Sequence, residues 1–462
     1  MRPSFLLAVV TGAVLPALGC SSFRAANEPL ARWDPATGYR AARVVEERGL
    51  GDVLVMLAFS GGGTRAAALS YGVLQELRDT PIEIDGRRRR LLDEVDSISS
   101  VSGGSFTSAY YGLHGDRIFE DYEERFLRRD VEGELLLGLL NPLEWFRFAS
   151  SFFDRSDMAV RLYDEDVFQG ATFADLEAAG GPLLQINATD LAAGHHFTFS
   201  QGQFDFLCSD LAKLPLARAV TASSAVPGLF SPIVLENYAG NCGFEPPAGF
   251  DEALQQRRTD PRRFRVATIL NGYLDPRTRP YVHLLDGGIS DNIGLRVPLE
   301  NVILAGGPAG RLQQVHAQSI RRVLVIVVNA EVHPPPQWDL AAVSPGLATI
   351  LGAVTDTQIY AFNFETIELM RESLRRWARE LPPGPGGEPI PVSLVTVDFE
   401  RIEDARERAF FEAVPTSLSL PEETVARLVA VARRLLRESP EMRELVAEIG
   451  APPQEGGAPA SR

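Results

Sequence analysis

The sequence predicts an α/β layered domain built on a largely parallel β-sheet. Apolar runs of strand length alternate along the chain with stretches of helical periodicity. Two of these runs pass through a turn of small residues straight into a helical stretch. The 462 residues, 45% of them hydrophobic and 23% charged, are also enough to bury a sizeable core.

The expected elements follow in order along the chain. Strands are expected at 53–59, 97–101, 183–188, 196–200, 282–285, 323–329 and 392–397. Helices are expected at 66–77, from the glycines after Ser102 to Tyr111, over much of 119–170, and at 403–414 and 421–438. Four consecutive arginines at 87–90 are expected in a solvated loop or cap.

Composition divides the chain into five parts. We expect a signal peptide at 1–19, a polar lead-in or tether at 20–50, a main domain at 51–380, a C-terminal extension packed on it at 381–450 and a disordered tail at 451–462. Within the main domain, the helical insertion at about 119–170 is rich in aromatic residues, namely Trp145, Phe146, Phe148, Phe152 and Phe153. Ordinary core packing is the favoured interpretation of these rings, and an apolar lid over a binding site is the alternative.

The first twenty residues resemble an export signal. Arg2 supplies a positive charge, and the apolar run at 5–18 is shorter than the about 20 residues that span a bilayer. The four residues ending at Cys20 resemble a bacterial lipoprotein box, in which the cysteine becomes the lipidated first residue. A plain secretory signal is the alternative. With Ser21 after Cys20, the resemblance implies an exported, lipid-anchored protein of the bacterial outer membrane, facing the periplasm.

The charge and the other cysteines limit the partners and the compartment. The formal net charge is −16, from 45 basic and 61 acidic residues. This charge disfavours nucleic acid and gives no electrostatic attraction to anionic lipid, so a membrane contact must be apolar or anchored. In an oxidising compartment Cys208 and Cys242 can form a disulfide, and two buried free thiols are the alternative.

A serine turn is the strongest local pattern. The expected strand at 97–101 runs into Ser102-Gly103-Gly104 and then into a helix. A serine on such a turn is held out of the sheet, and its neighbours must be small because the backbone folds sharply there. The pattern is close to G-x-S-x-G, with Ser100 in place of the first glycine. On its own it also fits a structural Ser-Gly turn.

Three consecutive glycines, Gly61, Gly62 and Gly63, lie between a strand and a helix and precede Arg65. Consecutive glycines allow several backbone N–H groups to point at one anion. This suits a phosphate cradle or an oxyanion hole, and a plain tight turn is the remaining alternative. The turn has no G-x-x-x-x-G-K-[ST] pattern and no lysine, which favours the oxyanion hole.

A third pattern, Asp286-Gly287-Gly288, ends the strand-like run at 282–285, and Asn292 follows closely. Asp-Gly alone is typical of a hairpin turn. Its value lies in its combination with the serine turn and the three glycines.

Together, the three patterns resemble the patatin-like phospholipases, in which they occur in this order. A fourth block at 222–232 is similar to the Ala-Ser-x-Ala-x-Pro-x-x-Phe-x-Pro segment of that family, and 172–176 and 187–190 also resemble family segments. The similarity extends over roughly residues 50–300. Ser100 and Ala66 stand where the family often has glycine.

The resemblance implies a three-layer α/β/α fold, with a C-terminal α/β extension, and an acyl hydrolase that cleaves phospholipids or other acyl lipids. Ser102 would be the nucleophile and Asp286 its base, acting through an acyl-enzyme. The N–H groups of the three glycines would hold the oxyanion, with Arg65 supporting the loop. Further motif residues are Ser100, Gly103, Gly104, Gly287, Gly288 and Asn292. No metal or organic cofactor is implied.

Three rival functions stay open. A triad esterase would need one of the histidines, which are His114, His195, His196, His283, His316 and His333. None of them has an assigned catalytic role, and no metal-ligand spacing such as H-E-x-x-H is present. A lipid-binding or scaffold lipoprotein of the same fold would lack turnover. A nucleotide-binding protein would use the glycine-rich turn.

Overall fold

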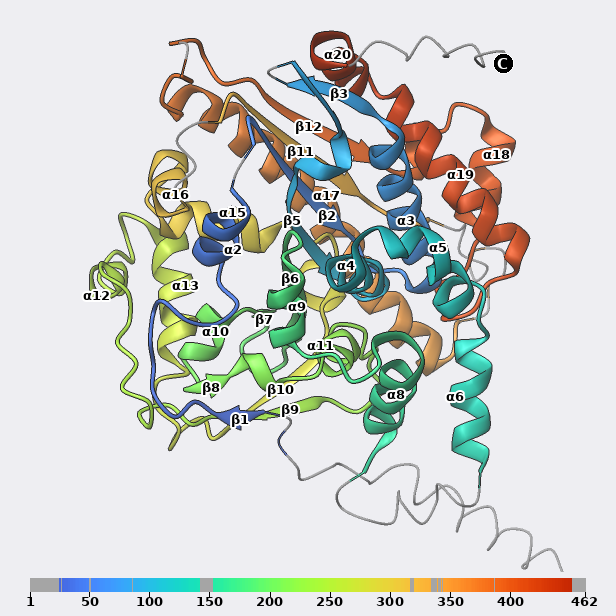
Figure 1. The fold of residues 1–462 in the computed structure, drawn as a ribbon. Helices are drawn as coiled ribbons and strands as arrows, with labels where there is room; N and C mark the ends of the chain where they lie inside the picture. The colour runs from blue at the N-terminus through green and yellow to red at the C-terminus, as the bar shows by residue number, and fades with distance from the viewer. Residues whose placement is uncertain are drawn as a thin grey trace, which may run out of the picture.

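Figure 1 shows the computed structural model. The structure describes residues 25–450 except 26, 50, 85, 142–152, 316–319, 334–338, 340, 341, 343 and 386. The signal peptide with Cys20, the aromatic residues from Trp145 to Phe152 and the tail at 451–462 therefore lie outside the described residues. In the part of the chain that is described, no helix combines the length and the apolar character needed to cross a membrane.

An eight-stranded sheet lies at the centre of the molecule (Figure 1). Its strands are β2 (Val53–Phe59), β5 (Val95–Val101), β6 (Leu183–Asp190), β7 (His195–Phe199), β9 (Ile233–Glu236), β10 (Tyr281–Asp286), β11 (Arg322–Val328) and β12 (Val392–Val397). The order is β12-β11-β2-β5-β6-β10-β9, and β7 also pairs with β6. The strands from β12 to β6 are parallel, whereas β7, β9 and β10 are antiparallel to their neighbours. The prediction of a largely parallel sheet is confirmed.

Helices cover both faces of the sheet, which gives three layers. On one face, the main core includes residues of α3 (Gly63–Asp79), α4 (Gly103–His114) and α19 (Glu422–Glu438). On the other face, a second core includes residues of α15 (Arg296–Leu304) and α17 (Leu347–Glu380). Along β2, Leu57 and Phe59 belong to the main core and Ala58 to the second, because successive side chains of a strand point to opposite faces.

The remaining elements surround this sandwich. The other helices are α2 (Ala41–Arg48), α5 (Ile118–Tyr122), α6 (Val131–Leu140), α8 (Arg155–Tyr163), α9 (Phe173–Ala179), α10 (Gln201–Asp205), α11 (Leu216–Ser223), α12 (Phe250–Ala253), α13 (Pro261–Asn271), α14 (Gly288–Asp291), α16 (Pro308–Gln314), α18 (Ala405–Glu412) and α20 (Pro440–Ile449). Two strands of two residues each, β1 (Glu28–Pro29) and β8 (Ser209–Asp210), pair with each other.

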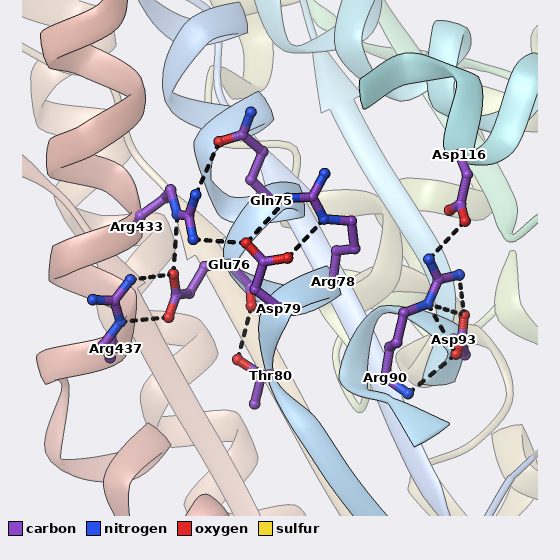
Figure 2. Close-up of polar contacts among 10 residues, drawn as sticks. All are labelled: Gln75, Glu76, Arg78, Asp79, Thr80, Arg90, Asp93, Asp116, Arg433 and Arg437. Atoms are coloured by element: carbon purple, nitrogen blue, oxygen red, sulfur yellow. Dashed lines mark hydrogen bonds and ion pairs between the residues drawn. The ribbon is translucent and has the colours of Figure 1, made fainter. Parts of the chain in front are cut away.

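Several elements differ from the sequence expectations; β9, α11, α13 and α15, for example, were not expected. The arginines at 87–90 form the exposed strand β4 (Arg87–Arg90), which pairs with β3 (Pro81–Ile84), rather than a loop or cap. The hairpin satisfies their backbone groups while the side chains reach acidic neighbours, as Arg90 does with Asp93 and Asp116 (Figure 2). The long helix α17 was not expected, although its apolar residues, which include Met370, Leu374 and Trp377, recur at helical spacing against the second core.

An ion-pair network joins α19 to α3 (Figure 2). The guanidinium of Arg437 donates two hydrogen bonds to Glu76, at 2.6 and 2.7 Å. Arg433 bridges Glu76 and Asp79, at 3.2 and 2.7 Å. The Glu76 side chain is only 6% exposed, so its charge needs these partners. The network therefore fixes a C-terminal helix against the helix that follows the three glycines.

A disulfide joins Cys208 to Cys242. The lead-in segment is hydrogen-bonded to both cysteines. The N–H of Leu30 donates to the carbonyl of Cys208 at 2.7 Å, and the N–H of Trp33 donates to the carbonyl of Cys242 at 2.9 Å. The bridge thereby holds part of the lead-in on the surface of the domain.

Candidate active site

Ser102 occupies the sharp turn between β5 and α4. Its φ of 48° and ψ of −122° lie in a region that residues with a side chain rarely adopt. The N–H of Ser102 donates to the hydroxyl of Ser223 at 2.8 Å, which stabilises the turn. The first turn of α4 begins directly behind it, so the positive end of the helix lies next to the serine.

Asp286 ends β10, and strand pairing brings it to Ser102. On β6, Asn187 pairs with Val101 of β5, and the next residue, Ala188, pairs with Asp286 of β10. The ends of two strands far apart in sequence therefore meet beside one point of β6. The Ser102 hydroxyl donates to Oδ2 of Asp286 at 3.0 Å.

Burial sets the ionisation of this pair. Burial raises the pKa of Asp286 to about 6, against the opposing effects of the N–H of Gly288 and the hydroxyl of Ser102. The Gly288 N–H donates to Oδ1 of Asp286 at 2.7 Å. At neutral pH the carboxylate is thus mostly ionised, with a proton affinity higher than that of an exposed aspartate. Such a group can accept the serine proton.

The glycine loop, Gly61–Gly63, packs directly against the serine turn. Gly62 and Gly63 have φ values of 136° and 60°, which glycine adopts at little cost. A Cβ added to Gly103 would lie 2.0 Å from the carbonyl oxygen of Gly63. A Cβ added to Gly61 would lie 3.2 Å from the Cβ of Ser102. The two motifs can touch only because these side chains are absent.

The backbone N–H groups of the glycine loop are not equivalent. The Gly61 N–H donates to the carbonyl of Asn292 at 2.9 Å. Among the described residues, the N–H groups of Gly62 and Gly63 have no acceptor. The geometry therefore leaves two of the three expected donors available to an anion. Gly61 was expected to be an oxyanion donor, but its N–H is already hydrogen-bonded to Asn292, in the loop after Asp286.

Arg65 anchors the glycine loop to distant segments. Its buried guanidinium donates to the carbonyl of Ala330 at 2.8 Å, to the hydroxyl of Thr416 at 3.0 Å and to the carbonyl of Val414. Burial lowers the pKa of Arg65 to about 10, so the group stays charged at neutral pH. The N–H of Thr64 also donates to the carbonyl of Ser417, at 2.9 Å. The loop is thus held from the segment that follows β11 and from residues 414–417.

The other predicted motif residues are buried around this centre. Ser100, on β5, hydrogen-bonds Ser108, on α4, at 2.6 Å. At the remaining positions an added Cβ would approach a neighbour closely, namely Gly104 at 2.7 Å from the Ser60 carbonyl, Gly287 at 2.4 Å from the Asn187 carbonyl and Gly288 at 3.0 Å from Oδ1 of Asp286. Cys208 and Cys242 belong to the disulfide that holds the lead-in, and Cys20 lies outside the described residues.

Two residues without a predicted role connect the motifs. The Ser223 hydroxyl accepts from the N–H of Ser102 and donates to the carbonyl of Asn187 at 2.6 Å, while the Ser223 carbonyl accepts from the N–H of Gly287 at 3.0 Å. The amide of Asn187 donates to the Ser99 hydroxyl at 3.0 Å. Both residues lie in segments that resembled the family, at 222–232 and 187–190, and this was the available signal.

The histidines take no part in this arrangement in the described part of the chain. There, no histidine hydrogen-bonds Ser102 or Asp286. His195 and His196 contact Glu300, and His333 contacts Glu331. His316 lies outside the described residues. A serine–aspartate pair is therefore the arrangement that the geometry presents.

Several solved structures show weak similarity to this chain. Human GIVD cytosolic phospholipase A2 matches at 12% identity and a TM-score of 0.45, over 92% of this chain and 68% of that one. The same enzyme in complex with methyl gamma-linolenyl fluorophosphonate matches at 13% and 0.41, over 88% and 61%. The type III effector protein ExoU matches at 15% and 0.21, over 58% and 62%. TM-scores below 0.5 are too low for these likenesses to establish the fold or the activity.

The family is shown by the sequence itself. No match to the chain is found among curated proteins. A family model described as patatin-like phospholipase matches residues 57–299, which is more than half of the chain and includes Ser102 and Asp286. The chain belongs to the patatin-like phospholipase family.

Proposed function

We propose that this protein is a serine acyl hydrolase that cleaves acyl ester bonds of phospholipids or other lipids. The observation that carries the proposal is the position of Ser102 on a sharp strand-to-helix turn, with its hydroxyl 3.0 Å from the buried carboxylate of Asp286. Membership of the patatin-like phospholipase family supports a lipid substrate.

In the acylation step, Oγ of Ser102 attacks the ester carbonyl carbon while its proton passes to Oδ2 of Asp286. The negative charge that develops on the carbonyl oxygen is held by the N–H groups of Gly62 and Gly63. Removal of one such donor typically costs about 3–4 kcal/mol of transition-state stabilisation. The ester C–O bond then breaks, and the leaving alcohol takes the proton from Asp286. An acyl-Ser102 ester remains.

In the deacylation step, water takes the place of the alcohol. Asp286 accepts a proton from the attacking water, and the same two N–H groups hold the second oxyanion. The bond from the acyl carbon to Oγ breaks, and the proton returns from Asp286 to Ser102. The products are a free fatty acid and the regenerated enzyme.

We further propose that the protein is exported and anchored through a lipid on Cys20, at the bacterial outer membrane facing the periplasm. The short apolar run before Cys20 supports this, and a disulfide between Cys208 and Cys242 suits an oxidising compartment. An anchor would keep a chain of net charge −16 beside its lipid substrate. Labelled palmitate should enter the wild-type protein and not a Cys20→Ser variant; labelling that survives the substitution would refute the anchor.

The hydrolase proposal is tested with the full chain in detergent, using a short-chain chromogenic ester and a fluorogenic phospholipid in mixed micelles. The wild type should hydrolyse at least one of these substrates. Ser102→Ala and Asp286→Asn should each lower kcat/KM by about 10⁴-fold or more while circular dichroism stays unchanged. A Ser97→Ala variant controls for a serine on the same strand and should stay active.

Each outcome bears on one part of the proposal. Activity that survives Ser102→Ala would refute the nucleophile, and activity that survives Asp286→Asn would refute the base. A folded wild type without activity on any acyl ester would favour the non-catalytic lipid-binding lipoprotein.

A further inference from the structure

A second cluster of reactive side chains lies outside the serine–aspartate pair. His195 and His196 begin β7, and Glu300 lies on α15, 105 positions after His195. One ligand atom of each residue lies within 4.8 Å of the ligand atoms of the other two. The side chains are 12%, 10% and 15% exposed, so they are largely shielded from bulk water.

The contacts of the two ring nitrogens of His195 are best satisfied when Nε2 carries a positively charged partner. Nδ1 of His195 lies 3.0 Å from the carbonyl oxygen of His196, and a carbonyl only accepts, so Nδ1 carries the hydrogen. In a neutral imidazole, Nε2 then presents a lone pair, and it faces Oε1 of Glu300 at 3.3 Å. Two acceptors facing each other repel. Either a proton or a metal ion on Nε2 resolves this conflict.

The second histidine places a further ring nitrogen beside the same carboxylate. Nε2 of His196 lies 3.3 Å from Oε2 of Glu300, while its Nδ1 is buried without a hydrogen-bond partner in the described structure. Zinc binds imidazole nitrogen at 2.0–2.1 Å with tetrahedral geometry, which places neighbouring ligand atoms about 3.3 Å apart. The two Nε2 atoms lie at this spacing from the Glu300 carboxylate, that of His195 from Oε1 and that of His196 from Oε2. The carbonyl bond of His195 is also the kind of contact that orients a metal-binding histidine.

A cavity gives the cluster access to small molecules. Its volume is about 450 Å³, and His195, His196 and Glu300 are among its lining residues, whereas Ser102 and Asp286 are not. An ion held by three protein ligands would thus have an open position for water or a small ligand.

We propose that His195, His196 and Glu300 bind one divalent transition-metal ion of the zinc class. Two imidazoles and one carboxylate suit zinc, cobalt or nickel, whereas magnesium and calcium prefer all-oxygen ligand sets. Arg296, on the same helix as Glu300, adds positive charge near the ligands, which further disfavours ions held by charge alone. The ion would join β7 to α15, and α15 follows the loop that contains Asn292. The site is independent of the proposed hydrolase function.

Metal binding is measured directly on the full chain without a polyhistidine tag. The chain is stripped with a chelator and titrated by calorimetry with Zn²⁺ alone, then with Mg²⁺ and Ca²⁺. We expect one Zn²⁺ per chain, no binding of Mg²⁺ or Ca²⁺, and a Tm that rises with Zn²⁺ concentration. Co²⁺ bound in place of zinc should give visible absorption bands typical of tetrahedral coordination, and these report on the wild type even if a variant fails to fold.

Substitutions locate the ion. Glu300→Gln and His195→Gln should each weaken Zn²⁺ binding by at least about tenfold. His333→Gln is the matched control, because His333 contacts a single carboxylate, that of Glu331 at 3.0 Å, and it should leave binding unchanged. A folded wild type that binds no Zn²⁺ would overturn the proposal. Unchanged affinity in folded Glu300→Gln would also overturn it.

Discussion

Two regions of the molecule build the proposed active site in different ways. The strand ends at Ser102 and Asp286 carry the reacting groups, and they meet because β6 pairs with both strands. Residues 414–417 contribute no reacting group, but their carbonyls and a hydroxyl hold Thr64 and Arg65 beside the glycine loop. This second region lies outside the family match at 57–299. The chemistry is thus encoded in short motifs, while the position of the oxyanion donors also depends on a segment that has no motif.

Among substitutions that leave Ser102 and Asp286 in place, the largest effect is expected where the serine turn meets the glycine loop. In Gly103→Ala, the new methyl group would lie 2.0 Å from the Gly63 carbonyl, so the turn and the loop must separate. Loss of aligned oxyanion donors should lower kcat/KM by about 10³-fold on a chromogenic ester. Gly352→Ala is the control, because nothing lies within 4 Å of the added atom and the position is exposed. Near-normal activity in Gly103→Ala would show that this contact does not position the donors.

The next effect tests the anchoring of the glycine loop by residues 414–417. Arg65→Met removes the donors to the buried carbonyls of Ala330 and Val414. Unpaired buried acceptors should lower the free energy of unfolding by about 2–4 kcal/mol, measured by urea denaturation. A displaced loop should also lower kcat at temperatures where the variant is folded. If stability falls and kcat stays normal, residues 414–417 support the fold without positioning the oxyanion donors.

The pH dependence of kcat/KM tests Asp286, which belongs to the region with the motifs, without involving residues 414–417. Burial raises the pKa of Asp286 to about 6, and the proposed base works only as the carboxylate. As pH falls below about 6, kcat/KM should drop by about tenfold per unit, and it should reach a plateau above pH 7. Burial also raises the pKa of Asp291 to about 6, so Asp291→Asn is the control and should keep the same acidic limb. If the acidic limb of the profile moves in Asp291→Asn, the titrating group is Asp291 and not Asp286.

The smallest effect is expected at the outer edge of the C-terminal part. Arg437→Ala removes two of the hydrogen bonds to Glu76, but the guanidinium is 60% exposed and Arg433 remains as a partner. Screening by solvent should limit the loss of unfolding free energy to about 1 kcal/mol or less, with kcat unchanged. Arg376→Ala, which breaks an exposed i,i+4 pair with Glu380 on α17, is the comparison variant and should cost less. A large loss of kcat in Arg437→Ala would show that α19 also helps to position the oxyanion donors.

The fold and the motif residues were largely predictable from the sequence because their signals are local. The strands at 53–59 and 392–397 were predicted with the observed bounds, and the glycine loop and serine turn were predicted as connections to α3 and α4. Hydrophobic runs that end in small residues encode such elements without reference to the rest of the chain. The Ser102–Asp286 proximity was inferred only through the family resemblance.

The remaining features depend on contacts between distant segments. Each of these contacts joins positions far apart in sequence. They are the hydrogen bond from Gly61 to Asn292, the hydrogen bond from Ser102 to Ser223, and the hydrogen bonds from Arg65 to residues 414–417. The cluster of His195, His196 and Glu300 has no recognisable ligand spacing for the same reason. The arginines of β4 were misassigned because a short hairpin, rather than their charge, determines their backbone conformation.

Covalent trapping tests the central claim, that Ser102 is a nucleophile activated by Asp286, most directly. The full chain is treated with an alkyl fluorophosphonate, whose phosphorus is attacked by an activated serine and loses fluoride. Peptide mass spectrometry should find one adduct, on Ser102, in the wild type, far slower labelling in Asp286→Asn and none in Ser102→Ala. A folded wild type that is labelled elsewhere, or labelled at Ser102 at an equal rate in Asp286→Asn, would contradict the account.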